Sequence, residues 1–243
     1  MPEISIKAEE VFHVGSFFVT NSLLLAVLTL LILVIVAVVL RSRLSLIPGK
    51  LQNFCEIALE PLLNLMDSVL GSRHLSEKYL PLVGTIFLFV VISNWLGLFP
   101  LVGPLEIESK HVVPLFRAPA SDLNFTIAIA IIAILGVHLA AILGLGFKRH
   151  FNKFFTLKNP IFSFVGILEF ISEFIKIISF SFRLFGNVFA GEVLLLIVGF
   201  LAPYLIPLPF LFLEVFVGFI QAFIFSMLTL VFVAMATSKE EAH

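Results

Sequence analysis

A mostly apolar stretch of about forty residues, at positions 161–200, is the strongest constraint on how this chain can fold. A helix rises about 1.5 Å per residue, so this stretch would be close to 60 Å long, about twice the apolar thickness of a bilayer. Inside a membrane it must therefore be strongly tilted or broken. A second long apolar stretch, at 205–236, follows a proline-rich turn. We expect the two to form a tilted helical hairpin.

Three further apolar stretches, at 17–40, 80–99 and 123–147, are each long enough to cross a hydrocarbon core of roughly 30 Å. Between the first two, residues 50–70 place acids and amides every three or four positions opposite aliphatic residues, which is typical of an amphipathic helix on a membrane surface. Hydrophobic residues make up 60% of the 243 residues, far more than in a soluble domain. The sequence predicts a single all-α membrane domain over 1–243, with five membrane-embedded helices and one surface helix.

The placement of basic residues predicts the orientation, because short loops rich in lysine and arginine stay in the cytoplasm. Such loops lie at 41–50 and at 148–158. Five crossings then place the amino terminus outside and the carboxyl terminus in the cytoplasm. The loop at 106–122 falls outside, although its Lys110 and Arg117 go slightly against the rule.

Composition and motifs exclude several classes of function. The net charge is −1 and the basic residues gather in loops rather than on one face, which argues against nucleic-acid binding. The single Cys55 has no cysteine or histidine at metal-ligand spacing, so neither a metal site nor a cofactor is predicted. The sequence contains no Gly-x-x-x-x-Gly-Lys-Ser/Thr loop, so we expect no direct nucleotide binding.

Arg183 lies near the middle of the 161–200 stretch. An arginine at bilayer depth costs roughly 2.5–3.5 kcal/mol on insertion scales, so it indicates an ion pathway or a partner charge. At helical spacing its face also carries four other polar residues. These are Glu169, Glu173, Lys176 and Asn187. On the next helix Glu214 and Gln221 are two turns apart and share a face, whereas Glu192 points away from Asn187.

The predicted orientation places Glu192 and Glu214 toward the outside, and Glu169 and Glu173 toward the inside, with Arg183 between them. Carboxylates in a partly wet, apolar site can pass protons, whereas arginine stays charged and cannot donate one. This order favours two half-pathways over one continuous pore. Asp122, Asn124, Asn94 and His138 are candidates for an outer vestibule, although such residues more often have ordinary structural roles.

The run SFSFRLFGNVFAGE at 179–192, followed by QAFIF at 221–225, resembles the signature of subunit a of the F-type rotary ATP synthase. Three shorter motifs look like landmarks of the same family, in the family's order. These are PGK at 48–50, SNW at 93–95 and PASDLN at 119–124. The similarity covers nearly the whole chain.

This resemblance implies that Arg183 is the essential stator arginine facing the ring of c subunits, with Asn187 and Gln221 beside it. It implies that Glu192 and Glu214 line the outer half-channel. Glu169, Glu173 and Lys176 then belong to a candidate inner half-channel. The implied partners are the c-ring, the peripheral-stalk b subunits and the lipid bilayer, and the implied function is proton translocation coupled to rotation.

Several alternatives remain open at this point. One of the two outer positions is often histidine in the family, so the order of proton transfer between Glu192 and Glu214 is not determined. Whether the coupling ion is H⁺ or Na⁺ depends largely on the c-ring. The membrane is a bacterial inner membrane or that of an organelle of bacterial descent. The competing function is an ion-coupled secondary transporter, whose folds often contain inverted repeats, and the chain shows no convincing internal repeat.

Overall fold

The computed structural model describes residues 8–14, 17–45, 48–98, 106–108, 112–114, 117–147, 160–202 and 205–237. The elements in chain order are β1 (Glu10–Val14), β2 (Phe17–Thr20), α1 (Asn21–Ser42), α2 (Lys50–Leu70), α3 (Arg73–Gly97), β3 (Glu106–Glu108), β4 (Val112–Pro114), the 3₁₀ turn η2 (Pro119–Ser121), α4 (Leu123–Leu145), α6 (Pro160–Leu201) and α7 (Pro207–Thr237). The basic connector at 148–158, Lys110 and the tail at 238–243 lie outside the described residues.

Five of the described helices, α1, α3, α4, α6 and α7, are long and apolar enough to cross a membrane. The sixth, α2, has its polar residues concentrated on one face. The prediction of an all-α membrane protein is confirmed. The strands form two short antiparallel pairs, β1 with β2 and β3 with β4, and contribute little to the architecture.

The predicted start of the first helix at residue 17 is wrong. Residues Phe17–Thr20 pair with Glu10–Val14 as strands, and α1 begins at Asn21. The Thr20 hydroxyl accepts a hydrogen bond from the Leu23 amide at 3.3 Å and so satisfies one of the free N–H groups of the first turn. Hydropathy could not separate the strand from the helix, because both are apolar.

The predicted start of the second span at residue 80 is also too late, since α3 begins at Arg73. The Ser72 hydroxyl accepts from the Leu75 amide at 3.4 Å, which caps the helix seven residues before the apolar run begins. The loop at 106–122, expected to be irregular, contains the short β3–β4 pair and η2.

Helix α2 ends at Gly71, whose φ of 70° lies in the left-handed region and whose amide donates to the Asp67 carbonyl at 2.8 Å. Glycine reaches this conformation without a Cβ penalty, so the chain can turn directly into α3. Leu62 and Met66 of α2 are then buried against α3, α4 and α7. The other buried members of this cluster are Tyr79, Val83, Val137, Ala140, Leu230 and Val233.

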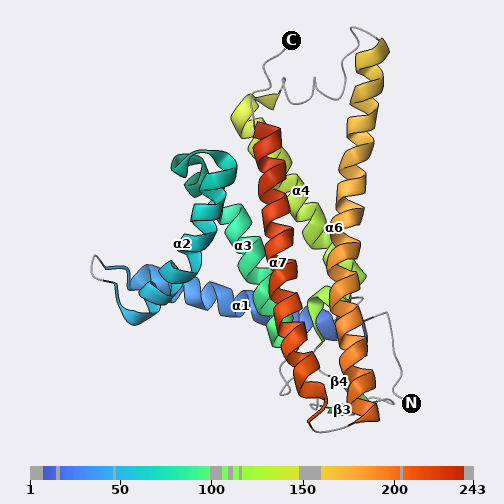
Figure 1. Ribbon diagram of the computed structural model, residues 1–243. Helices are drawn as coiled ribbons and strands as arrows, with labels where there is room; N and C mark the ends of the chain where they lie inside the picture. The colour runs from blue at the N-terminus through green and yellow to red at the C-terminus, as the bar shows by residue number, and fades with distance from the viewer. Residues whose placement is uncertain are drawn as a thin grey trace.

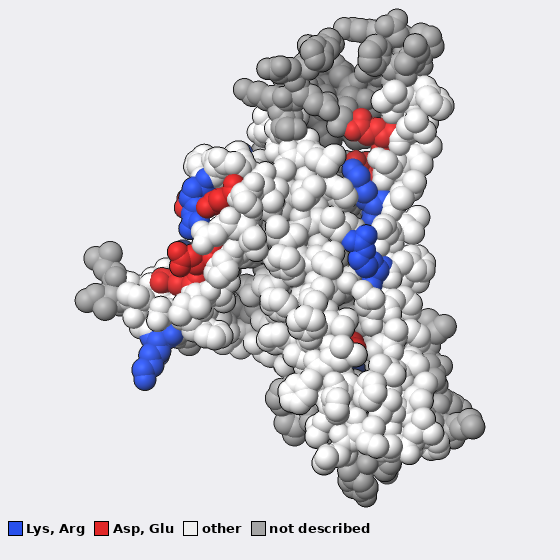
Figure 2. Space-filling model, viewed as in Figure 1, with Lys and Arg blue, Asp and Glu red and all other residues white. Residues whose placement is uncertain are grey.

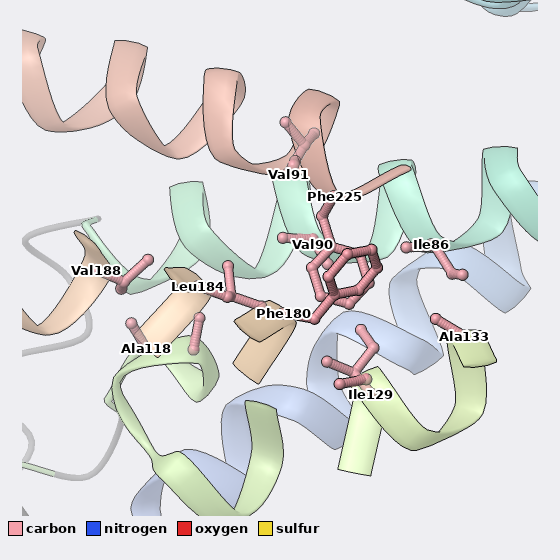
Figure 3. Packing of buried hydrophobic residues seen from close by; sticks show 13 residues of the cluster. Ile86, Val90, Val91, Ala118, Ile129, Ala133, Phe180, Leu184, Val188 and Phe225 are labelled. Atoms are coloured by element: carbon pink, nitrogen blue, oxygen red, sulfur yellow. The ribbon is translucent and has the colours of Figure 1, made fainter. Parts of the chain in front are cut away.

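A larger core joins α3, η2, α4, α6 and α7, as Figure 3 shows. Phe180 of α6 lies near its centre, with its ring centroid 4.8 Å from that of Phe225 on α7. Small residues, among them Ala118, Ala130 and Ala133, line the η2 and α4 side of this core. Small side chains allow helix backbones to approach closely in a membrane, where van der Waals packing replaces the hydrophobic effect.

Helices α6 and α7 form an antiparallel hairpin in contact along its length, and α1 crosses the hairpin direction at a wide angle (Figure 1). Because of this crossing, no orientation in a bilayer can hold both α1 and the hairpin upright. With 42 residues, α6 is about 63 Å long, well beyond the thickness of the apolar layer. The arrangement agrees with the tilted hairpin predicted from the sequence.

Candidate functional site

Charged side chains follow the α6 edge of the molecule in a single column, whereas most of the remaining face is uncharged (Figure 2). Along α6 they divide into three groups. The first, named here the Glu173 cluster, consists of His138, Glu173 and Lys176, and the second contains Arg183 with the Asn187–Gln221 pair. The third, the Glu192 cluster, consists of Arg117, Ser121, Glu192 and Glu214. Arg183 is about 15 Å from Glu173 and about 13 Å from Glu192 along the helix axis.

Arg183 faces outward from α6 and is exposed. Its Nη2 donates to the Ser179 hydroxyl one turn earlier, at 3.4 Å. Within the described part of the chain no carboxylate lies within ion-pair distance of this guanidinium. The neighbouring Phe182 is 55% exposed, and a Cβ added at Gly186 would meet nothing within 4 Å. The guanidinium therefore lies on an open, largely apolar face.

Asn187 and Gln221 connect the two helices of the hairpin next to Arg183. The Asn187 Nδ2 donates to the Gln221 Oε1 at 2.7 Å, and Gln221 is only 2% exposed. On the other side of α7, the Asn94 Nδ2 of α3 donates to the Gly218 carbonyl at 3.3 Å. The Gln221 Nε2 and the Asn94 Oδ1 are buried and make no hydrogen bond within the described residues. Both can form a further polar contact in this region.

The Glu192 cluster joins a loop residue to α6. The Arg117 Nε lies 3.0 Å from the Glu192 Oε1 and 3.3 Å from its Oε2. The same nitrogen donates to the Ser121 hydroxyl at 3.0 Å, and the Arg117 Cζ lies 5.9 Å from the centroid of the Phe189 ring. Arg117 is 8% exposed and Glu192 is 37% exposed. One side of the Glu192 carboxylate is thus held by a buried arginine while the other remains accessible.

Glu214 of α7 is 6% exposed and packs directly against α6 at Gly191. A Cβ added at Gly191 would overlap the Glu214 carboxyl group, so glycine is the side chain that leaves room for it. Since Gly191 precedes Glu192, the structure brings the two predicted carboxylates of this group to the same part of the hairpin. Sequence spacing on separate helices did not determine this contact.

Asp122 has a structural role beside this cluster. Its Oδ1 accepts from the Asn124 amide at 2.9 Å and caps α4, and its Oδ2 accepts from the Ser22 hydroxyl of α1 at 2.9 Å. It is 8% exposed. Asn124 contributes its backbone to this cap, and its side chain is exposed. The predicted vestibule residues Asp122 and Asn124 therefore hold the ends of α1 and α4 together around η2.

The Glu173 cluster is more open. The Lys176 Nζ donates to the Glu173 Oε1 at 2.7 Å, and the His138 Nε2 of α4 lies 3.7 Å from the Glu173 Oε2. The Lys176 ammonium also lies 4.6 Å from the centroid of the Phe232 ring. Glu173 is 16% exposed, and His138 and Lys176 are each 27% exposed. Glu169 lies one turn before Glu173 and is half-buried.

The grouping of His138 with the outer vestibule is wrong. His138 is fifteen positions after Leu123 on α4, or about 22 Å along the helix. Because α4 and α6 pack together, this depth brings His138 to Glu173, away from Asp122 and Asn94. The vestibule hypothesis placed all four residues together without using their positions along the helices.

Arg117 is the residue that the sequence analysis missed. Its signal was its position in a loop predicted to lie outside, where the preference for basic residues in cytoplasmic loops disfavours it. Nearby acids were taken to account for it, but its partner, Glu192, is 75 positions later.

The arrangement suits proton transfer rather than metal or covalent chemistry. No group of three or more His, Cys, Asp or Glu side chains is placed to bind a metal within the residues that the structure describes. The groups present are carboxylates, amides and an imidazole, which can exchange or relay protons, and guanidinium groups, which remain charged. Two sets of proton-exchanging groups are thus separated along α6 by a fixed positive charge.

Comparison with known proteins agrees with this geometry. A family model described as ATP synthase A chain matches residues 22–234. ATP synthase subunit a of Campylobacter jejuni is 36% identical over 232 residues, which cover 96% of this chain and 91% of the relative. Subunit a of Campylobacter fetus is 33% identical over 243 residues and the whole of both chains, and that of Helicobacter acinonychis is 33% identical over 238 residues, 96% and 98% of the two chains. This chain therefore belongs to the ATP synthase A chain family.

Proposed function

We propose that this chain is the proton-translocating stator subunit of the ATP synthase membrane sector. Two offset half-channels would load and unload the carboxylates of a c-ring and so couple proton flow to rotation. Family membership supports the role in the membrane sector, and the five long apolar helices support an integral protein of a bacterial inner membrane. The peripheral-stalk b subunits are the other expected partners, and ATP chemistry would reside in other subunits of the complex.

The observation that carries this proposal is the exposed Arg183 between two polar clusters. A guanidinium keeps its charge at any physiological pH, and leaving it at bilayer depth without a counter-charge is costly. In the described residues no carboxylate of this chain compensates it. A carboxylate on an adjacent c subunit would supply the missing partner, and the small Gly186 and Ala190 on the same face would let that helix approach.

The two clusters provide the two half-channels. If the loop containing Arg41 and Arg43 is cytoplasmic, the Glu173 cluster lies toward the cytoplasm and the Glu192 cluster toward the outside. Each is more than 10 Å from Arg183 along α6, beyond the reach of a direct hydrogen bond. A proton would therefore cross the central region on a rotor carboxylate. A potential of 100 mV supplies about 2.3 kcal/mol per charge for this transfer.

Replacing the central guanidinium tests the proposal. In inverted membrane vesicles that contain the whole complex, we expect Arg183→Ala to abolish ATP-driven proton pumping and to increase passive proton leakage. The physical reason is that the rotor carboxylate loses its opposing charge and the two half-channels are no longer separated. Proton pumping is measured with a pH-sensitive dye and leakage by the decay of an imposed pH gradient.

Arg43→Ala is the matched control, since Arg43 is an exposed arginine at the end of α1, outside the three polar groups. It should leave pumping and leakage unchanged. Normal coupled pumping by Arg183→Ala would disprove the stator assignment.

A further inference from the structure

We propose that Arg117 is a positioning residue of the outer half-channel, which holds the Glu192 carboxylate against the η2 turn and next to Glu214. This inference rests on the function proposed above, because it assigns a role within that half-channel. It concerns a loop arginine that sequence patterns grouped with surface charges.

The contact between Arg117 and Glu192 is specific in its geometry. A single nitrogen, the Arg117 Nε, lies between the two carboxylate oxygens at 3.0 and 3.3 Å. Contacts of this length between ionised groups are charge-assisted and roughly twice as strong as neutral hydrogen bonds. The guanidinium is only 8% exposed, so little water competes for it. Glu192 is therefore restrained in one rotamer by a partner that is itself buried.

Arg117 is in turn fixed by its surroundings. Its Nε also donates to the Ser121 hydroxyl, and that hydroxyl donates to the Ala118 carbonyl at 2.9 Å. Within η2 the Ser121 amide donates to the same carbonyl at 3.0 Å. On the α3 side, a Cβ added at Gly97 would lie 2.8 Å from the Ala118 Cα, so the turn packs closely against that helix. The anchor for Glu192 is thus a buried turn in contact with several helices.

The charge balance points to the same pairing. A buried arginine needs a compensating charge, and breaking such a pair leaves the remaining charge uncompensated. Glu192 is the carboxylate that the structure places at the Arg117 guanidinium, while its other side stays 37% exposed. The pair therefore combines a fixed position with access for an incoming proton donor.

The position of Glu192 matters because Glu214 is fixed as well. The Glu214 carboxyl fills the space beside Gly191, the residue before Glu192. Proton transfer requires heavy atoms to come within about 2.6–3.2 Å, directly or through one water. A displacement of about 1 Å can reduce the rate of such a step about a hundredfold. Holding Glu192 in one rotamer keeps this separation constant between turnovers.

A double-mutant cycle tests whether Arg117 acts through Glu192. Vesicles with the whole complex would carry Arg117→Gln, Glu192→Gln or both, and the rate of ATP synthesis driven by an imposed proton gradient would be measured per assembled complex. We expect each single variant to be slower by roughly tenfold to a hundredfold. The double variant should be no slower than Glu192→Gln alone, because Arg117 has no carboxylate left to position. Losses that multiply in the double variant would overturn the inference.

Two further variants separate positioning from general support of the fold. Arg117→Lys keeps the charge and should retain more activity than Arg117→Gln. Arg73→Gln breaks an exposed ion pair to Asp67 at 2.9 Å, outside the three polar groups, and should leave the synthesis rate unchanged. If Arg117→Gln lowers the amount of assembled complex, recovery of assembly in the double variant supports the pairing, and continued loss contradicts it.

The Arg183→Ala variant, measured in the same vesicles, distinguishes the two proposals. Uncoupling by Arg183→Ala together with multiplicative losses in the cycle would reject the role of Arg117 alone. Normal coupling by Arg183→Ala would reject the stator function itself, and the outer half-channel with it.

Discussion

The Glu192 cluster and the Glu173 cluster use similar residue types in different ways. The first joins the η2 turn, α6 and α7, and includes a buried arginine and a carboxyl group that is 6% exposed. The second joins α4 and α6, and its three side chains are 16% to 27% exposed. One set of charges is held by distant parts of the chain, and the other is held largely by neighbours on one helix.

The difference shows how burial and rigidity are achieved at the two sites. Lys176 and Glu173 are three residues apart, and such a pair needs only a helix to form. The Glu192 cluster needs a glycine at 191 and a packed turn at 118–121 before its charges can meet. A fixed, buried carboxylate pair is the costlier arrangement, and we expect proton transfer to depend on it more strongly.

Neutralising one carboxylate in each cluster tests this expectation directly and should have the largest effect. Glu214→Gln should reduce proton-driven ATP synthesis by about a hundredfold or more, because a buried relay group is lost. Glu173→Gln should reduce it by less than about tenfold, since its surroundings are open to solvent that can substitute. Synthesis rates per assembled complex in vesicles provide the measurement. A greater loss in Glu173→Gln would reverse the proposed ranking of the clusters.

A smaller effect is expected when the space for Glu214 is filled. Gly191→Ala places a methyl group where the Glu214 carboxyl lies, and such overpacking typically costs about 1–3 kcal/mol. The thermal unfolding midpoint of the complex in detergent should fall, and proton-driven synthesis with it. Gly199→Ala on the same helix is the control, because a Cβ there meets nothing within 4 Å. Equal midpoints for the two variants would mean that the hairpin is loosely packed at Gly191.

The smallest effect is expected at an ion pair that belongs to neither cluster. The Ser76 hydroxyl and the Arg73 guanidinium hold the pKa of Asp67 below its ordinary value of 3.8. A lowered folded-state pKa stabilises the fold above that ordinary value, and this stabilisation is lost as the pH falls through the folded-state value. Asp67→Asn should therefore flatten the acid side of the stability profile slightly, between about pH 5 and pH 3. Unfolding midpoints measured across this range would show it, and a steeper acid loss in Asp67→Asn would contradict the sign.

The fold was largely predictable because lipid imposes simple rules on sequence. Every backbone polar group in the apolar layer must be satisfied within its own segment, so long apolar stretches become helices. The errors occurred at helix ends, where hydropathy carries no information. Thr20 and Ser72 set the starts of α1 and α3 through hydroxyl caps, and the residues on both sides of these caps do not differ enough in polarity to reveal them.

The candidate site was predictable only where its residues share a helix. Helical spacing related Glu173 to Lys176, and Glu214 to Gln221. It could not relate His138 to Glu173, or Arg117 to Glu192, because those contacts depend on how separate elements pack. A charge that opposes a topology rule, as Arg117 does, is the remaining sequence signal for such a contact.

The wide crossing between α1 and the α6–α7 hairpin affects the footprint of the subunit. A helix that lies across a membrane presents its length sideways, and about 63 Å of α6 would extend past roughly six upright helices spaced about 10 Å apart. When a neighbour advanced by one such spacing, most of the buried contact area would be exchanged rather than lost. The subunit could thereby stay attached throughout each step while the helix opposite Arg183 changes.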